Sequence, residues 1–359
     1  MFQNKQILIC CPPDNKPEYL GTAADLLDPD WEPFPFFYEG AFPGEARLLI
    51  SWCQFRDYER AAIMNAKKAG LATLLVADGV LEWRNTWEHP EFSRGEIYQP
   101  IIADKMACIG PAQIRILESW GNRGKCEPVG MPRLDSYLSL KKKSLRSQET
   151  FHLLIMTARN PGFTPKQVET TIMSLRDLAQ WMKHHPNLHG RMIKPIWRID
   201  AKLAGELSLS EAIGSHASLV EDLKKADAVI TNPSTTQIES MLCGIPVALL
   251  DYHNRPHYVP AAWTISASSH IESVLSKLVN PDPVRMAYQE YLLHDNLFCR
   301  TPSAPRLGTL VREMLRIQEE CRRGKKNLKL PQYILKPDPS TFSRTSCAES
   351  AMTKPERTG

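Results

Sequence analysis

The sequence lacks the long apolar runs that mark membrane proteins. No stretch approaches the ~18–20 consecutive apolar residues that a membrane-spanning helix needs. The first apolar segment, Ile7–Cys11, has five residues before two prolines, which is too short for the core of a signal peptide and typical of a first β-strand. We therefore expect a cytoplasmic protein.

The sequence also lacks paired cysteines. Its nine cysteines form no CxxC motif and no zinc-finger spacing with histidine. Several lie inside apolar runs, as in Ile7–Cys11 and Met106–Ile109. Cysteines in such positions are most often buried, reduced thiols of a protein in a reducing compartment.

A strong excess of charge of one sign is absent from most of the chain. The net charge is +4, but residues 321–359 carry nine Lys/Arg against three Asp/Glu. Subtraction from the totals of 44 and 40 leaves 35 basic and 37 acidic residues in positions 1–320. A folded part this close to neutral argues against nucleic acid as a partner.

Strand-like and helix-like segments alternate through the first part of the chain. Apolar strands joined through helices indicate a parallel sheet covered on both faces. Gly70 and Gly121 follow the two expected helices as stop signals. The expected strands are Lys5–Cys11, Arg47–Trp52, Leu71–Ala77 and Asp104–Ile109, and the helices are Asp57–Ala69 and Ala112–Trp120.

A second α/β series follows, so that 359 residues divide into about two domains. Its expected strands are Phe151–Thr157, Arg191–Ile196, Ala228–Thr231 and Pro246–Leu250. Its expected helices are Val168–Trp181, Leu219–Lys225, Ser234–Cys243, His270–Val279, Pro283–Leu292 and Ala304–Glu320. We predict an N-terminal Rossmann-like domain at 1–137, a linker at 138–150, a C-terminal Rossmann-like domain at 151–321 and a basic, disordered tail at 322–359.

The linker carries a cluster of basic residues, Lys141, Lys142, Lys143 and Arg146. A solvated linker is the simplest interpretation of this cluster. The alternative is peripheral contact of the linker or the basic tail with the anionic inner face of a membrane.

The segment Asp227–His257 carries the clearest functional pattern. A buried strand meets a turn and then Ser234, Thr235 and Thr236, which begin a helix. The free amides of a first helical turn, together with the helix dipole, attract phosphate. Glu239, one turn further on, is placed to reach a ribose hydroxyl. The alternative is that the hydroxyl residues only cap a structural helix and that Glu239 is a surface charge.

This segment resembles a known signature. The pattern Ser-Thr-Thr-x-x-Glu-Ser-x-x-x-Gly-x-Pro-Val, from Ser234 to Val247, is similar to that of the second domain of GT-B glycosyltransferases, and closest to UDP-N-acetylglucosamine 2-epimerases and CDP-glycerol glycerophosphotransferases. The resemblance implies that amides near Ser234 and Thr235 hold a diphosphate and that Glu239 holds the ribose. Arg255, followed by Pro256, matches an Arg-Pro of the epimerases and joins the expected nucleotide site.

The first half supports the same resemblance. Pro128–Asp135 contains the Gly-x-Pro-Arg-x-Asp segment that ends the N-terminal domain in these families. The implied fold is GT-B, with two Rossmann-like domains whose parallel sheets face a central cleft. Two positions depart from the glycerophosphotransferases: Asp78-Gly79 stands where they carry His-Gly, and Lys194 to Trp197 stand where they carry Lys-x-His-Pro. Both departures argue against glycerophosphate transfer.

Sugar transfer needs a base for the acceptor hydroxyl. The segment Ala77–His89 follows a strand of the first domain and carries several titratable side chains. Asp78 or Glu82 is the expected base, with His89 as the next candidate. The alternative is a polar loop whose tryptophans anchor it in the core.

The departing diphosphate needs cations or amides. Arg159 lies in the loop 157–164 after a strand of the second domain, and we expect Lys194 and Arg198 to lie after another strand. Arginine can bind phosphate in bidentate fashion. The alternative is that these cations are solvated surface residues.

The chemistry of the residues and the family resemblance together indicate the expected function. We expect a metal-independent glycosyltransferase, without a cofactor, that moves a sugar from a nucleotide-sugar donor to a glycan or lipid-linked acceptor in surface polysaccharide assembly. Asp251, His253 and His257 match no standard metal pattern. Two alternatives remain: an enzyme like the UDP-N-acetylhexosamine 2-epimerases, and a non-catalytic nucleotide-binding relative.

Overall fold

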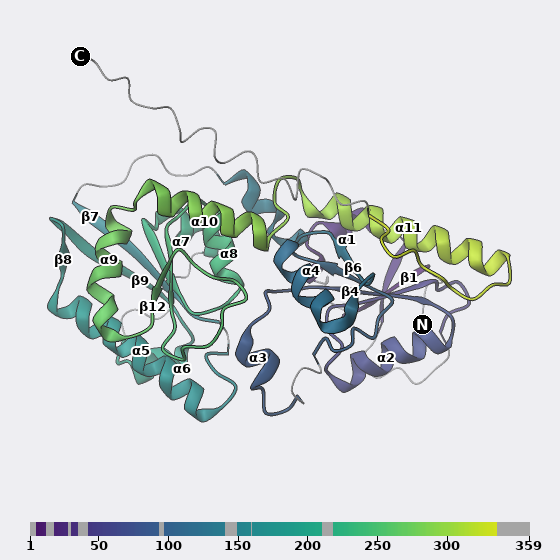
Figure 1. Cartoon of the computed structure of the whole chain (residues 1–359), viewed down its shortest axis with the longest axis horizontal. Helices are drawn as coiled ribbons and strands as arrows, with labels where there is room; N and C mark the ends of the chain where they lie inside the picture. Colours follow the sequence, from purple (N-terminus) through teal and green to yellow (C-terminus); the bar gives the residue numbers. More distant parts are fainter. Residues whose placement is uncertain are drawn as a thin grey trace, which may run out of the picture.

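The computed structural model shows two α/β domains beside each other, each built on a six-stranded sheet (Figure 1). It describes residues 5–11, 18–27, 30–34, 42–92, 97–140, 149–158, 160–209 and 218–335. None of the helices in these ranges is both long and apolar enough to span a bilayer.

The sheet of the first domain is entirely parallel, in the order β2-β1-β3-β4-β5-β6. All residues of β1, β3, β4 and β5 are buried, as continuous apolar strands require when helices cover both faces. The strands are β1 Ile7–Cys10, β2 Trp31–Phe34, β3 Leu48–Ser51, β4 Ala72–Val76, β5 Lys105–Cys108 and β6 Cys126–Pro128.

The helices of the first domain end largely where the sequence predicts. Helix α2 is followed by Gly70 at φ +78°, a left-handed conformation that glycine adopts without strain. Gly121, at φ +89°, ends the helical segment that follows β5. The helical elements are η1 Glu18–Leu20, α1 Ala23–Leu27, α2 Asp57–Lys68, α3 Trp83–Trp87, α4 Pro111–Leu117, η2 Glu118–Asn122 and η3 Pro132–Ser139.

The sheet of the second domain has the order β12-β11-β10-β7-β9-β8, and only β8 is antiparallel to its neighbour. The strands are β7 Thr150–Met156, β8 Asn187–Leu188, β9 Arg191–Arg198, β10 Ala228–Thr231, β11 Val247–Leu250 and β12 Trp263–Ile265. The helices are α5 Pro165–His184, α6 Ala201–Glu206, α7 Leu219–Lys225, α8 Thr235–Leu242, η4 Ser268–His270, α9 Ile271–Val279 and α10 Pro283–Asn296.

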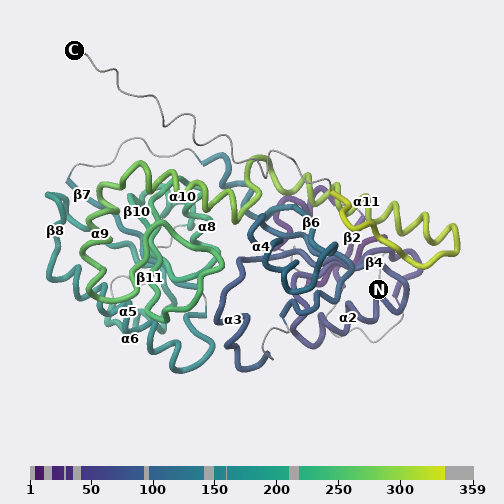
Figure 2. Tube along the Cα trace, viewed as in Figure 1, coloured from purple at the N-terminus to yellow at the C-terminus, as the bar shows by residue number. Residues whose placement is uncertain are grey.

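The last helix, α11 (Ser303–Arg323), returns to the first domain and packs along it (Figures 1 and 2). Its side chains Leu307 and Val311 are buried in one cluster with Ile7 of β1. Asp135 of η3 caps the helix by accepting hydrogen bonds from the amides of Ser303 (2.7 Å) and Ala304 (2.8 Å). The expected boundary at residue 321 is therefore misplaced, because α11 contributes to the core of the first domain.

The segment after α11 is also ordered against the first domain, contrary to the expected disorder from residue 322. Lys105 Nζ donates to the backbone oxygen of Pro331 at 2.7 Å, and the Glu127 carboxylate accepts from the amide of Ile334 at 2.9 Å. Lys105 and Glu127 form an ion pair at 2.7 Å in which both side chains are buried. The basic linker residues Lys141, Lys142, Lys143 and Arg146, and tail residues 336–359, lie outside the described ranges.

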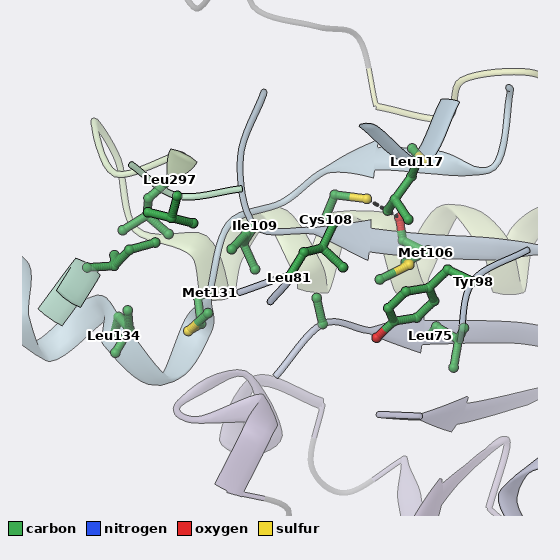
Figure 3. Close-up of a cluster of buried hydrophobic side chains, with 14 of the residues drawn as sticks. Leu75, Leu81, Tyr98, Met106, Cys108, Ile109, Leu117, Met131, Leu134 and Leu297 are labelled. Atoms are coloured by element: carbon green, nitrogen blue, oxygen red, sulfur yellow. Dashed lines mark hydrogen bonds between the residues drawn. The ribbon is translucent and has the colours of Figure 1, made fainter. Parts of the chain in front are cut away.

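One hydrophobic cluster runs through both domains. It contains Leu8 of the first sheet and Leu154 of the second. Figure 3 shows part of it, from Leu75 of β4 to Leu297, the residue that follows α10. This shared core fixes the two sheets relative to each other and so defines the space between them.

Candidate functional site

Each sheet reverses its strand order at one point, and both points open toward one cleft. The reversal lies between β1 and β3 in the first sheet and between β7 and β10 in the second. Ligands of open parallel sheets bind beyond the carboxyl ends of the strands at such points. The cleft has a volume of about 1270 Å³ and is lined by residues that follow strand ends in both domains, among them Trp52, Asp78, Thr157 and Ser234.

The N-terminus of α8 opens into this cleft. Ser234 is its N-cap residue, but the Ser234 side chain makes no capping hydrogen bond to the amides of the first turn. The hydroxyl groups bond one another instead: Ser234 Oγ lies 2.6 Å from Thr236 Oγ1, which lies 2.9 Å from Thr231 Oγ1. Ser234, Thr235 and Thr236 all line the cleft. The positive end of the helix dipole is therefore presented to whatever occupies the cleft.

Glu239 also faces the cleft rather than bulk water. Its side chain is only 5% exposed, and Oε1 accepts a hydrogen bond from Nη1 of Arg133 at 2.9 Å. Arg133 belongs to the first domain and also donates to the backbone oxygen of Asp78 at 3.1 Å. Arg133 is not among the predicted site residues, although it belongs to the Gly-x-Pro-Arg-x-Asp segment of the sequence.

The geometry explains each defining residue of that Gly-x-Pro-Arg-x-Asp motif. Gly130 has φ +98°, and an added Cβ would lie 2.3 Å from Ser303 Oγ, so a side chain would collide with the start of α11. Pro132 begins η3, and Asp135 caps α11. Arg133 joins the two walls of the cleft. A motif recognised by resemblance thus holds the domains and the last helix together.

Asp78 follows β4 and lines the cleft beside the α8 N-terminus. The amide of Val80 donates to Thr235 Oγ1 at 3.3 Å, and an added Cβ on Gly79 would lie 2.9 Å from that oxygen. The surrounding walls desolvate Asp78 and raise the pKa of its carboxyl, although the charge of Arg133 opposes this shift. A carboxylate with a raised pKa suits a general base.

Glu82 lines the cleft, but its carboxylate is engaged locally. It caps α3 by accepting from the amide of Asn85 at 2.8 Å, and it pairs with Nε of Arg84 at 2.6 Å. Because different oxygens accept these two bonds, the structure gives Glu82 a positioning role in α3 rather than that of an available base.

His89 lines the cleft as a neutral ring. Its Nδ1 accepts a hydrogen bond from the amide of Glu91 at 3.2 Å, and burial lowers its pKa. A neutral imidazole that accepts at Nδ1 carries its proton on Nε2, which makes that nitrogen a donor. The ring stacks on Phe92 at 4.2 Å. His89 is therefore suited to contact a ligand but poorly suited to take a proton from one.

The expected phosphate-binding cations are distributed differently from the prediction. Lys194 is exposed in the middle of β9 and does not line the cleft, because this strand continues to Arg198. Arg198 does line the cleft and pairs with Asp222 at 3.1 Å. Arg255 pairs with Glu88 of the first domain at 2.6 Å. Arg159 lies outside the described residues, and its role stays a prediction.

Across the described ranges, no group of three or more His, Cys, Asp and Glu side chains could hold a metal ion. Asp251 and His257 instead form a pair, with Oδ2 and Nε2 2.7 Å apart. Burial acts to raise the pKa of Asp251, but the hydrogen bond and charge of His257 outweigh it and lower that pKa.

Two Rossmann-like domains facing one cleft, with a last helix that returns to the first domain, define the GT-B fold. The chain has this fold, and solved structures with the same fold resemble it along most of its length. A variant of the wall teichoic acid polymerase TagF matches with a TM-score of 0.56 and 15% identity, over 89% of this chain and 90% of that one. The S. aureus MnaA–UDP structure matches with a TM-score of 0.59 and 11% identity, over 87% of this chain and 97% of that one.

A putative UDP-N-acetylglucosamine 2-epimerase from Listeria monocytogenes matches with a TM-score of 0.57 and 10% identity, over 87% of this chain and 97% of that one. No protein-family model matches the sequence, and no curated protein does either. At these identities the likeness establishes the fold, and the function must be argued from the cleft.

Proposed function

We propose that the protein is a GT-B glycosyltransferase that transfers a sugar from a nucleotide-sugar donor to a glycan or lipid-linked acceptor in surface polysaccharide assembly. One observation carries the proposal: the uncapped N-terminus of α8 opens into the cleft beside Asp78, which stands on the opposite domain. An anion site and a candidate base thus lie on the two sides of one cleft.

The residues divide the work as follows. Amides at Ser234–Thr236 bind the diphosphate of the donor, and Glu239, held by Arg133, accepts a hydrogen bond from a ribose hydroxyl. Asp78 takes the proton of the acceptor hydroxyl as the new bond to the anomeric carbon forms and the bond from that carbon to the diphosphate breaks. The α8 dipole and Arg133 stabilise the departing charge.

Two similar structures support a nucleotide-linked substrate. MnaA was solved with UDP, and the TagF variant was soaked with CDPG. The polymer made by TagF is a wall component, which supports a role in surface polymer assembly. The likeness to the putative UDP-N-acetylglucosamine 2-epimerase from Listeria monocytogenes covers 97% of that chain and keeps a 2-epimerase reaction as the second candidate.

The experiment is a thermal-shift screen with UDP-, CDP-, GDP- and CMP-linked sugars. We expect at least one to raise the melting temperature, and Thr235→Glu to abolish the shift because it places a carboxylate at the anion site. Thr309→Glu, the same change at an exposed position of α11, should keep the shift. If no nucleotide shifts the melting temperature, the proposal fails.

A second step separates the two reactions. The nucleotide sugar that binds is incubated alone and with candidate acceptors, and products are followed by NMR. Inversion of configuration at C2 of the sugar in the absence of an acceptor would identify an epimerase and overturn the transferase proposal. Transfer that requires an acceptor would support it.

A further inference from the structure

Five ring side chains form a continuous row along the wall of the cleft, in the order Trp52, Phe55, Phe92, His89 and Phe163. We call this set the aromatic row. Successive ring centroids lie 6.3, 4.9, 4.2 and 4.7 Å apart, and all five residues line the cleft. The first four belong to the first domain, and Phe163 extends the row across the cleft from the loop between β7 and α5.

The position of the row matches a ligand site. Trp52 directly follows β3, one of the two strands at the reversal point of the first sheet, where such sheets bind ligands. The rings are half-buried, so packing fixes their orientation while part of each surface faces the cleft. None of the five rings belongs to the donor site proposed at Ser234–Thr236 and Glu239.

The charges beside the row differ from those at α8. Glu18, Asp57 and Glu91 also line the cleft from the first domain. The guanidinium of Arg56 lies 4.6 Å from the centre of the Trp52 ring. In all, the first-domain lining of the cleft carries five carboxylates (Glu18, Asp57, Asp78, Glu82 and Glu91) and three arginines (Arg56, Arg84 and Arg133). This excess of negative charge disfavours a phosphate-bearing ligand, whereas carboxylate oxygens readily accept hydrogen bonds from sugar hydroxyls.

We propose that the aromatic row binds the sugar rings of an uncharged glycan acceptor. A pyranose has a face of C–H groups whose slight positive charge is attracted to the negative face of an aromatic ring. Its hydroxyls point outward from the ring, toward groups such as Asp57 and Glu91 and the Nε2–H of His89. This inference rests on the proposed function, because it names the acceptor for the donor bound at α8.

The test is saturation-transfer NMR with neutral tetrasaccharides (chitotetraose, cellotetraose and maltotetraose) and with uridine. We expect at least one tetrasaccharide to receive saturation at ring C–H protons. Phe55→Ala and Phe163→Ala, one from each domain, should each weaken that binding about ten-fold, the order of one lost stacking contact. Phe163→Tyr should bind the tetrasaccharide as the parent protein does, because the aromatic ring is kept.

Tyr291→Ala removes an exposed ring from α10 and serves as the matched control, for which we expect unchanged binding. The row is not a glycan site if none of the three tetrasaccharides binds, or if binding survives both alanine variants. Weakened uridine binding in those variants would mark the row as a nucleobase site and also overturn the inference. Thermal shifts by nucleotide sugars are measured on the same variants, so a failed donor site and a failed acceptor site give different results.

Discussion

The two walls of the cleft have the same topology and different chemistry. On each wall a parallel sheet reverses its strand order and directs the loops beyond its strands into the cleft. The second-domain wall presents hydroxyl groups and a helix N-terminus, whereas the first-domain wall presents aromatic rings and carboxylates. The sheets fix where a ligand lies, and the loop residues decide which chemistry it must have.

Arg133 links these two walls directly. It donates to the backbone of the Asp78 loop on one side and to Glu239 on the other. Substitutions at four positions test how the two walls differ and how they are joined. We expect their effects to decrease in the order Asp78, Arg133, Gly79 and Arg255.

The largest effect is expected from Asp78→Asn. It removes the candidate base without changing its size, and we expect kcat to fall by about 10²–10⁴-fold, the usual contribution of a general base. Asp282→Asn, at the N-cap of α10 where asparagine caps equally well, is the control and should leave kcat unchanged. If kcat of Asp78→Asn stays within about three-fold of the parent, Asp78 does not serve as the base.

The same residue sets a pH dependence. Because desolvation raises the pKa of Asp78, the carboxylate needed for catalysis forms only as pH rises through a value above the ordinary Asp range. Activity should therefore increase with pH along an acidic limb whose midpoint lies above the ordinary pKa of an aspartate. In Asp78→Asn this limb should disappear from the residual activity; its persistence would assign it to another group.

The next largest effect is expected at Arg133, which links the two walls. Arg133→Met leaves the buried Glu239 carboxylate without its cation, and we expect the free energy of unfolding to fall by about 2–3 kcal/mol, since breaking one side of a buried pair is costly and Arg133 is partly exposed. Urea denaturation measures this. The double variant Arg133→Met/Glu239→Gln should recover part of the loss; a strictly additive double variant would mean that the pair contributes nothing.

Gly79→Ala tests a close approach of the two walls. The added methyl group would lie 2.9 Å from Thr235 Oγ1, and overpacking of this kind costs about 1–3 kcal/mol. We expect a lower melting temperature that Thr235→Ala restores in the double variant, because the colliding oxygen is then absent. Equal melting temperatures for Gly79→Ala and the parent would show that the walls separate freely there.

The smallest effect is expected at Arg255, whose ion pair with Glu88 joins the two domains. Arg255→Ala loses an ion pair with Glu88 in which the Arg255 side chain is 49% exposed, worth at most about 1 kcal/mol of stability. We expect the nucleotide-sugar affinity to stay within about two-fold, as titration calorimetry would measure. A loss of ten-fold or more would restore the diphosphate role that resemblance gave to Arg255.

The sequence predicted what depends on local pattern. Apolar runs identified most long strands, Gly70 marked the end of α2, and the Ser234 turn was placed correctly at the start of α8. Strand β2 was missed because it has four residues and contains Pro33, which resembles a loop.

What the sequence did not predict depends on contacts between distant residues. The short helix α3 is braced by the second domain, where Trp87 Nε1 donates to Tyr258 Oη at 2.5 Å. Arg133 and Glu239 are 106 positions apart, so neither could be identified as the partner of the other. Lys194 was misplaced because β9 continues past it to Arg198, and hydrophobic pattern fixes the end of a strand only to about two to four residues.

The return of α11 and residues 324–335 to the first sheet has a consequence for synthesis on the ribosome. The side chains that cover Ile7 and the backbone groups that satisfy Lys105 and Glu127 are made long after the strands they serve. The earliest strands therefore expose an apolar face until the second half of the protein has emerged. Transiently exposed apolar surface of this kind favours the binding of chaperones to the nascent first half.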